Sequence, residues 1–367
     1  MKNNNAHSVY IHIPFCNSIC TYCDFPKLQY FRLFAEKYID SLIKQINEEK
    51  ILVDNIKTIY IGGGTPTSLD DDLFEMLLCA LDKFKKVEEF TIECNPESLS
   101  ESKLKLMKCH NVNRLSIGVE STDNKILKAI NRQHTFEDVI EKVNLARKFD
   151  FFNINLDLII GLPQCSKEML RKDIKNLINL KPTHISCYSL TVNPNTLMYL
   201  NNVKEKPTDE YRELYDIVNE ILEQNSYEHY EISNWAINKK YSKHNLCYWQ
   251  DDEYYGFGLG AAGYINGIRY ENTKSINEYI KGKYISNKEM VSNEEDEEYF
   301  LMLNLRTKFG ICLKKYQKRF NYSFFERYKT QIEHLIKQKL AILTNKNFYL
   351  TYDGMMILDS ILLDLFK

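Results

Sequence analysis

A sixfold alternation of short apolar strands and amphipathic helices restricts the fold more than any other feature of this sequence. The expected strands cover residues 9–12, 57–61, 90–94, 114–118, 153–160 and 184–190, and each precedes a segment with helical periodicity. Repeated βα units require parallel strands joined by crossover helices, and six of them predict an α/β fold with a partial (βα)6 barrel. Functional side chains of such a sheet are expected at the carboxyl ends of its strands.

The pattern loosens after residue 192. A helix is expected at 208–224, a strand at 227–232 and a glycine-rich strand and turn at 254–264, and the acidic cluster 294–298 opens another helix. The sequence therefore predicts three parts: a barrel at 1–192, a barrel extension at 193–290 and an α+β, winged-helix-like module at 291–367.

Three cysteines follow the first expected strand at spacings of four and three positions: Cys16, Cys20 and Cys23. Thiolates bind soft metals, and an iron–sulfur cubane normally takes four of them. Position 25 is Phe, and the next cysteine is Cys79. A 4Fe-4S cluster on this loop would therefore keep one iron for a ligand from outside the protein. A structural zinc site is the alternative, with His12 or His7 as fourth ligand, but a second Cys/His pair at zinc spacing is absent.

Further polar residues occur at or near the ends of the later strands. Gly62-Gly63-Gly64-Thr65 is not a P-loop, because no Gly-Lys-Ser/Thr follows, and its glycines allow close approach of backbone to a ligand or simply a turn. Asp157 stands in an apolar strand, where a carboxylate requires a partner. That partner is either Arg132, in an ion pair that only ties strands together, or a bound ligand.

The cysteine spacing after a strand resembles the radical S-adenosylmethionine (SAM) superfamily. The resemblance implies a 4Fe-4S cluster on the three cysteines, with SAM chelating the open iron. It also implies contacts with SAM at the matching positions Tyr10, Gly63, Gly64, Thr65, Glu93, Arg132 and Asp157. Glu120 stands where the family commonly has Gln, which keeps an acceptor and loses a donor.

The stretch from Tyr10 to Cys16 is similar to one branch of that superfamily, which contains oxygen-independent coproporphyrinogen III oxidase and the haem chaperones called HemW. Phe25 replaces a cysteine usual in the oxidase, and His244-Asn-Leu-Cys-Tyr-Trp249 resembles the His-Asn-x-x-Tyr-Trp motif of the chaperones. The resemblance implies a haem carrier rather than an enzyme, with His244 as the first candidate haem contact and Cys247 as the second. The alternatives are the oxidase activity, which decarboxylates coproporphyrinogen III through a SAM-derived radical, and another radical SAM reaction on a tetrapyrrole.

Composition and charge limit the kinds of partner and the compartment that we expect for this protein. The 367 residues carry a formal net charge of −2. Residues 306–340 hold ten Lys/Arg against two Glu, but such a charge run is usually a solvated face. We therefore expect no nucleic-acid partner. No apolar run approaches the roughly 18 residues of a membrane span. The amino-terminal residues resemble neither a signal nor a transit peptide, and ten cysteines without paired spacings favour a reducing compartment, the cytoplasm. The expected partners are haem and an acceptor haemoprotein, a respiratory one, with dimerisation left open.

Overall fold

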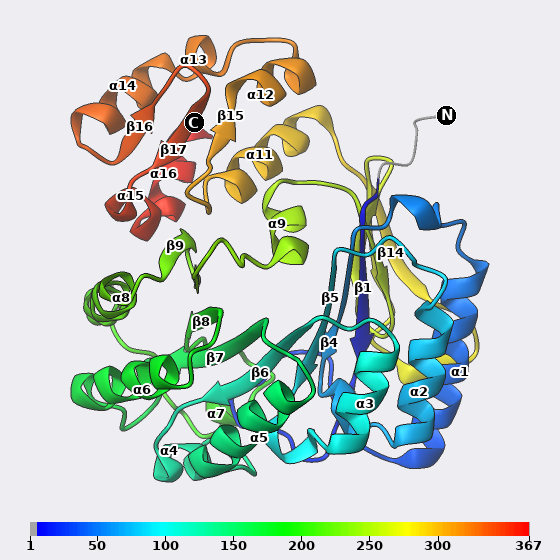
Figure 1. Cartoon of the computed structure of the whole chain (residues 1–367). Helices are drawn as coiled ribbons and strands as arrows, with labels where there is room; N and C mark the ends of the chain where they lie inside the picture. Colours follow the sequence, from blue (N-terminus) through cyan, green and yellow to red (C-terminus); the bar gives the residue numbers. More distant parts are fainter. Residues whose placement is uncertain (1–5, 367) are drawn as a thin grey trace.

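A twelve-stranded sheet organises the computed structural model, which describes residues 6–366 (Figure 1). Its strand order is β14-β13-β12-β11-β1-β4-β5-β6-β7-β8-β10-β9. All six expected barrel strands are confirmed as neighbouring parallel strands: β1 (Ser8–Ile13), β4 (Thr58–Gly63), β5 (Glu89–Cys94), β6 (Arg114–Glu120), β7 (Ile154–Ile160) and β8 (His184–Ser189). The partial barrel predicted from the alternation is therefore present.

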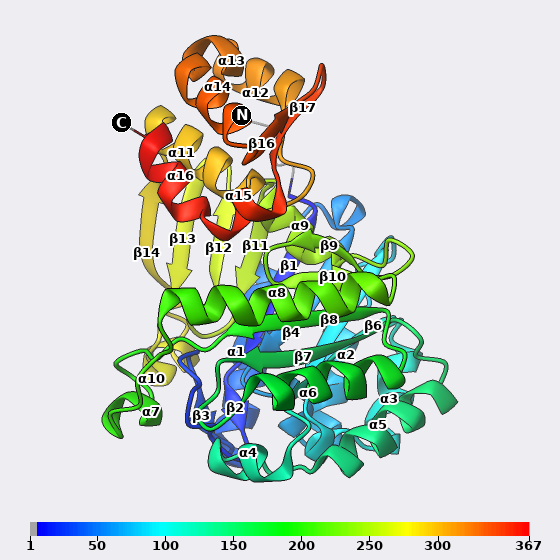
Figure 2. The same cartoon turned by 90° about the vertical axis from the view of Figure 1, so that its left-hand side faces the viewer.

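Strands from the middle of the chain widen this sheet at both edges. The glycine-rich stretch supplies a seventh parallel strand, β11 (Tyr254–Phe257), which pairs with β1. Antiparallel strands follow it: β12 (Ala262–Ile265), β13 (Ile268–Asn272) and β14 (Ile285–Met290). The opposite edge ends in the antiparallel strands β10 (Asn234–Ala236) and β9 (Glu228–Glu231). Figure 2 shows that this middle part continues the barrel sheet on both sides.

Helices on the outer face connect the parallel strands. They are α1 (Arg32–Glu48), α2 (Asp71–Leu81), α3 (Glu101–Cys109), α4 (Asn124–Ala129), α5 (Phe136–Lys148) and α6 (Lys167–Asn179). After β8, the helices α7 (Leu197–Leu200) and α8 (Thr208–Gln224) lead to the antiparallel edge strand β9. Ser100 and Ser166 accept hydrogen bonds from the first turns of α3 and α6, as N-cap residues do. Ser68 lies in the short 3-10 helix η2 (Pro66–Ser68), and α2 begins after it, at Asp71.

The carboxyl-terminal region has a hydrophobic core of its own, which includes Phe300, Tyr316 and Phe348. Its helices are α11 (Asn293–Asn304), α12 (Leu313–Phe320), α13 (Phe324–Arg327), α14 (Lys329–Lys337), α15 (Tyr352–Met356) and α16 (Leu358–Leu365). They surround a small antiparallel sheet of β15 (Ile311–Cys312), β17 (Asn347–Leu350) and β16 (Ala341–Leu343). This region sits beyond the amino ends of the parallel strands, and the short helix α9 (Lys243–Trp249) lies between the two (Figure 1).

Membrane insertion through a helix has no candidate among residues 6–366, because none of their helices combines the necessary length and apolar character.

Candidate metal and cofactor site

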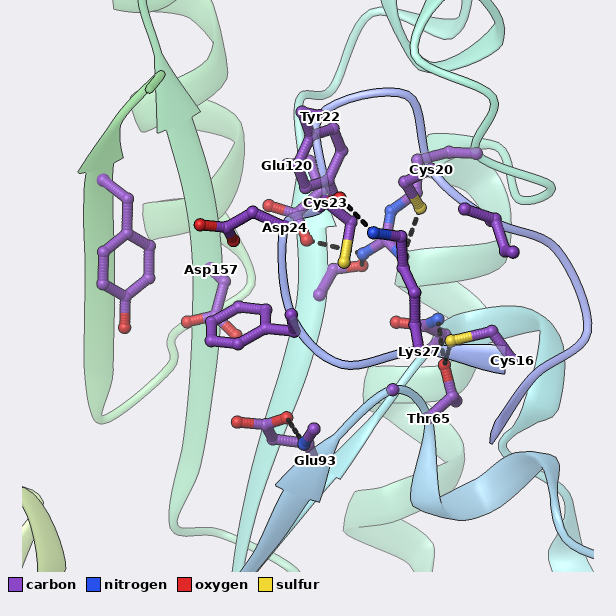
Figure 3. A pocket seen from close by; sticks show the side chains of 18 of the residues that line it. Cys16, Cys20, Tyr22, Cys23, Asp24, Lys27, Thr65, Glu93, Glu120 and Asp157 are labelled. Carbon is purple, nitrogen blue, oxygen red and sulfur yellow. Dashed lines mark hydrogen bonds and ion pairs between the residues drawn. The ribbon is translucent and has the colours of Figure 1, made fainter. Parts of the chain in front are cut away.

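The cysteine loop is held at both ends by a short pair of parallel strands. Phe15 of β2 (Phe15–Cys16) pairs with Leu28 of β3 (Leu28–Gln29), so residues 17–27 form a closed loop over the carboxyl ends of the barrel strands. Figure 3 shows the sulfurs of Cys20 and Cys23 on this loop and that of Cys16 at its start, with Glu93, Glu120 and Asp157 around the same space. All of these residues line one cavity of about 480 Å³.

The sulfurs are spread around the cavity rather than gathered at one point. Among the described residues, one set of three Cys, His or carboxylate side chains has ligand atoms within 4.8 Å of one another, and that set lies on the outer helices, away from this loop. A mononuclear zinc site also lacks its fourth ligand, because His12 is bonded through Nδ1 to the Tyr10 hydroxyl (3.0 Å) and through Nε2 to the Pro26 carbonyl (2.8 Å). His7 bonds to the Asn55 carbonyl instead (3.0 Å). The wider spacing suits a polynuclear cluster better than a single ion.

Two of the sulfurs are contacted by residues that the sequence had singled out. The Thr65 hydroxyl donates to Cys16 Sγ, and Arg132 Nη1 donates to Cys20 Sγ, each at 3.7 Å. Burial raises the pKa of Cys16 to about 11 and also raises the pKa of Cys23. These two thiols are therefore protonated near neutral pH without a metal, and binding one releases their protons.

The glycine turn packs directly under the loop. A Cβ on Gly64 would lie 2.9 Å from Cys16 Sγ, and Gly63 has a φ of +116°, where a side chain would also meet the His12 ring. Both positions therefore require glycine. The N–H groups of Gly63, Gly64 and Thr65 donate to Glu93 and to the Ile13 and Phe15 carbonyls. These three amide groups are thus already used, so the groups of this turn suited to an amine are its carbonyl oxygens.

Arg132 joins the loop to the end of β6. Its Nη2 donates to Glu120 Oε1 at 2.6 Å and to the Gly118 carbonyl at 2.9 Å. Glu120 adopts the left-handed φ of 66°, at a register shift where β6 pairs with β7. Such strained backbone in a non-glycine residue gathers at binding sites. Arg132 Nε is buried and has no hydrogen-bond partner among residues 6–366, so it is available to an anionic group in the cavity.

Asp157 has a different partner from the one considered above. Its carboxylate accepts hydrogen bonds from Asn155 Nδ2 (2.7 Å) and Ser116 Oγ (3.1 Å), whereas Arg132 pairs with Glu120. The Asp157–Arg132 ion pair was therefore the wrong pairing. Burial raises the pKa of Asp157, opposed by these hydrogen bonds.

Glu93 lies deeper, at the end of β5. The Tyr60 hydroxyl donates to its Oε1 at 2.7 Å and the Gly63 N–H to its Oε2 at 3.0 Å. Burial raises the pKa of Glu93 to about 7, with the two hydrogen bonds opposing the shift and nearby Asp157 adding to it. A carboxyl group with this pKa is ready to gain or lose a proton when a charged ligand arrives.

Several residues that line the cavity were not predicted from the sequence, and one predicted SAM contact does not line it. Tyr60, Lys27 and Asn95 line the cavity, and Asn95 Nδ2 donates to Thr65 Oγ1 at 3.0 Å. The signal for Tyr60 was its place in an apolar strand, where alternate residues share a face. Tyr10 is not among the residues found lining the cavity, and its hydroxyl is bonded to His12.

His244 lies in the interior near the opposite, amino end of the barrel. Its side chain is fully buried, with Nδ1 bonded to Thr58 Oγ1 (2.9 Å) and Nε2 to the Tyr248 hydroxyl (2.7 Å). Its backbone N–H donates to Glu89 at 3.0 Å. Burial lowers the pKa of His244 to about 3, so the ring is neutral. Both ring nitrogens are thus engaged, and axial ligation of haem by His244, as expected from the motif, does not fit this arrangement.

The other end of the same motif contacts the carboxyl-terminal region. The guanidinium of Arg306 lies 4.6 Å from the Trp249 ring centre, and Arg306 also pairs with Glu231 of β9 at 3.0 Å. Cys247 is buried as well, which raises its pKa to about 12. In this structure the six-residue motif fills the base of the barrel and joins it to the region that follows.

Known proteins similar to this chain cover nearly all of it. Residues 10–177 match the radical SAM superfamily, and residues 291–357 match the HemN C-terminal domain. The "Heme chaperone HemW" of Lactococcus lactis subsp. lactis (strain IL1403) is 38% identical over 359 residues, spanning 95% of this chain and 94% of that protein. The protein of the same name from Bacillus subtilis (strain 168) is 36% identical over 371 residues, spanning 95% and 96%.

A solved structure shares the fold along the whole length. Coproporphyrinogen III oxidase (HemN) from Escherichia coli, described as a radical SAM enzyme, matches with a TM-score of 0.85 over 98% of this chain and 90% of that one. Its sequence identity is 20%, so the likeness establishes the fold alone. Together with the near full-length identity to the two relatives above, these findings place the chain in the HemW haem-chaperone family of the radical SAM superfamily.

Proposed function

We propose that this protein binds haem and passes it to an acceptor haemoprotein, while Cys16, Cys20 and Cys23 hold a 4Fe-4S cluster with SAM as an exchangeable ligand. The observation that carries the proposal is the 38% identity to a haem chaperone along 95% of the chain.

The donors around the cavity fit a cluster with one open iron. Three thiols face the cavity, and the sulfurs of Cys16 and Cys20 are already stabilised by hydrogen bonds from Thr65 and Arg132. Phe25, where the oxidase of the same branch usually has a cysteine, also lines the cavity, and 60% of this residue is exposed. When bound, the cluster and SAM supply one-electron chemistry. The chain itself contributes three sulfur ligands and the cationic Arg132 beside them.

The polar groups of the cavity fit the charged end of SAM. The unpartnered Nε of Arg132 suits a carboxylate, and Glu93 together with the carbonyls of the glycine turn suits an ammonium group. Asp157, with two hydrogen-bond donors already on it, suits ribose hydroxyls. These roles are part of the proposal, as are the contacts assigned to Gly63, Gly64, Thr65 and Glu120. Tyr10 would act indirectly, by fixing His12 through its hydroxyl.

The compartment, the acceptor and the oligomeric state are further parts of the proposal. All ten cysteines are free thiols, which suits a reducing cytoplasm. We propose a respiratory haemoprotein as acceptor, and a dimer as a state in which the carrier could work. The basic excess of the carboxyl-terminal region supports no nucleic-acid role, since Arg306, Lys308, Arg319 and Arg327 are each ion-paired to acidic residues.

Haem titration of anaerobically reconstituted protein tests this function. We expect one haem per chain and its transfer to an apo-haemoprotein on mixing, both followed by the Soret absorption. Coproporphyrinogen III decarboxylation with SAM and a reductant, without stable haem binding, would instead support the oxidase activity.

A further inference from the structure

A second group of metal-binding side chains lies on the outer helices. Cys79 is near the carboxyl end of α2, Asp82 is the C-cap of α2, and His110 is the C-cap of the neighbouring helix α3. Each residue offers a ligand atom within 4.8 Å of the other two, and this is the one such group among the described residues. The cavity described above does not include any of the three.

The hydrogen bonds within the group orient the imidazole. His110 Nδ1 lies 2.9 and 3.0 Å from the two carboxylate oxygens of Asp82, and Nε2 lies 4.0 Å from Cys79 Sγ. A proton on Nδ1, donated to Asp82, leaves the Nε2 lone pair facing the sulfur. Many metal sites use the same order of groups, with a carboxylate fixing the tautomer of a ligating histidine.

The distance between sulfur and nitrogen suits a shared ion. Zinc binds sulfur at about 2.3 Å and imidazole at about 2.0 Å, so both ligands of one ion lie roughly 3.5–4 Å apart. The separation of 4.0 Å between Cys79 Sγ and His110 Nε2 lies within that range, and the exposed Cys79 side chain can adjust to an ion.

The local charge favours a bound cation. The carboxyl end of a helix carries partial negative charge, and α2 and α3 both end at this place. The Asp82 carboxylate adds a full negative charge there, half exposed, beside the mostly buried His110 ring. A bound divalent cation would compensate these negative charges.

We propose that Cys79 Sγ and His110 Nε2 bind one soft divalent cation such as Zn²⁺, with Asp82 holding the His110 ring and water completing the coordination. The site would be independent of the cluster loop and of haem. The test of this metal site is therefore independent of the test of the proposed function.

Cobalt titration tests this site, because a thiolate bound to Co²⁺ gives a charge-transfer band. The full-length chain with Cys16, Cys20 and Cys23 changed to Ser is the starting protein, so that loop thiols cannot contribute. We expect one Co²⁺ per chain with a thiolate band, displaced by Zn²⁺. Cys79→Ser should abolish the band, and Asp82→Asn should weaken affinity about 10–100-fold while keeping it.

Cys109→Ser is the matched control, because Cys109 is also an exposed thiol and sits next to His110 in sequence. It should leave the titration unchanged. Far-ultraviolet circular dichroism establishes that each variant is folded. The absence of a thiolate band in the starting protein, or a band that survives Cys79→Ser or is lost in Cys109→Ser, would overturn the proposal.

Discussion

Replacement of His244 by Ala is the change whose outcome the structure specifies most closely. The substitution empties a fully buried position between the rings of Tyr60 and Tyr248, whose centres lie 5.2 and 5.0 Å from the imidazole. It also leaves the Tyr248 hydroxyl and Thr58 Oγ1 without the ring, although Thr58 keeps its bond to Ser8 (2.7 Å). An unsatisfied buried group costs about 1–3 kcal/mol and a cavity adds to this, so we expect His244→Ala to lower the free energy of unfolding by about 3–5 kcal/mol.

Urea unfolding of the metal-free protein, followed by circular dichroism, measures this loss. Thr58→Val is the matched variant, because it removes the bonds of Thr58 Oγ1 to His244 Nδ1 and to Ser8 at nearly constant shape and should cost about 1–2 kcal/mol. The wild type should also lose stability as pH falls. Because burial lowers the pKa of His244 from 6.5 to about 3, its contribution is complete above pH 6.5 and is lost progressively below it. His244→Ala should remove that part of the pH dependence.

The same variants separate a structural role from haem ligation. If His244 only supports the barrel, haem affinity should follow stability and fall in both variants in proportion to the loss of folded protein. The contrary result would be a His244→Ala protein whose free energy of unfolding lies within about 0.5 kcal/mol of the wild-type value but which no longer binds haem. If Thr58→Val still bound haem normally, this result would refute a purely structural role for His244.

Three further predictions concern the cavity and the carboxyl-terminal contact. Cys20→Ser should abolish the visible absorption of the reconstituted cluster, as measured beside iron and sulfide analysis, and an unchanged spectrum would exclude Cys20 as a ligand. The pKa of Glu93 is raised from 4.5 to about 7, so the contribution of Glu93 to stability is complete below pH 4.5 and is lost as pH rises through 7. Urea unfolding should therefore show a free energy of unfolding that falls between pH 5 and pH 8, and Glu93→Gln should reduce this fall. Arg319→Met removes the ion pair of 2.8 Å between Arg319 and the buried Asp251. Asp251 keeps its other ion pair, with Arg269 at 2.9 Å. We therefore expect a loss of about 2–3 kcal/mol in urea unfolding, and no loss would mean that this contact does not hold the carboxyl-terminal region.

The strand and helix alternation predicted the barrel well because both periodicities are local. Helix α8 begins and ends at the expected residues, Thr208 and Gln224, and the six parallel strands lie where they were expected. Sheet order is not local. The pairing of β11 with β1, across more than 240 residues, depends on which edge of the finished sheet is open, and no short pattern around Tyr254 encodes it.

The candidate site was predictable to the extent that function restricts residue type. Cysteine spacing and strand-end polar residues located the cavity, since parallel strands bring their carboxyl ends together. The partner of Arg132 was not predictable, because Glu120 reaches it only through a left-handed backbone and a register shift in β6. His244 shows the same limit. Its motif indicated a haem contact, whereas burial and two hydrogen bonds became visible only with the fold.

Anaerobic haem titration of the protein loaded with about four iron and four sulfide per chain tests the central claim most directly. The account predicts saturation at one haem per chain, in a protein whose cluster spectrum responds to added SAM because one iron is open. A cluster spectrum that does not change when SAM is added would contradict the open iron, and a protein that binds no haem would contradict the carrier function.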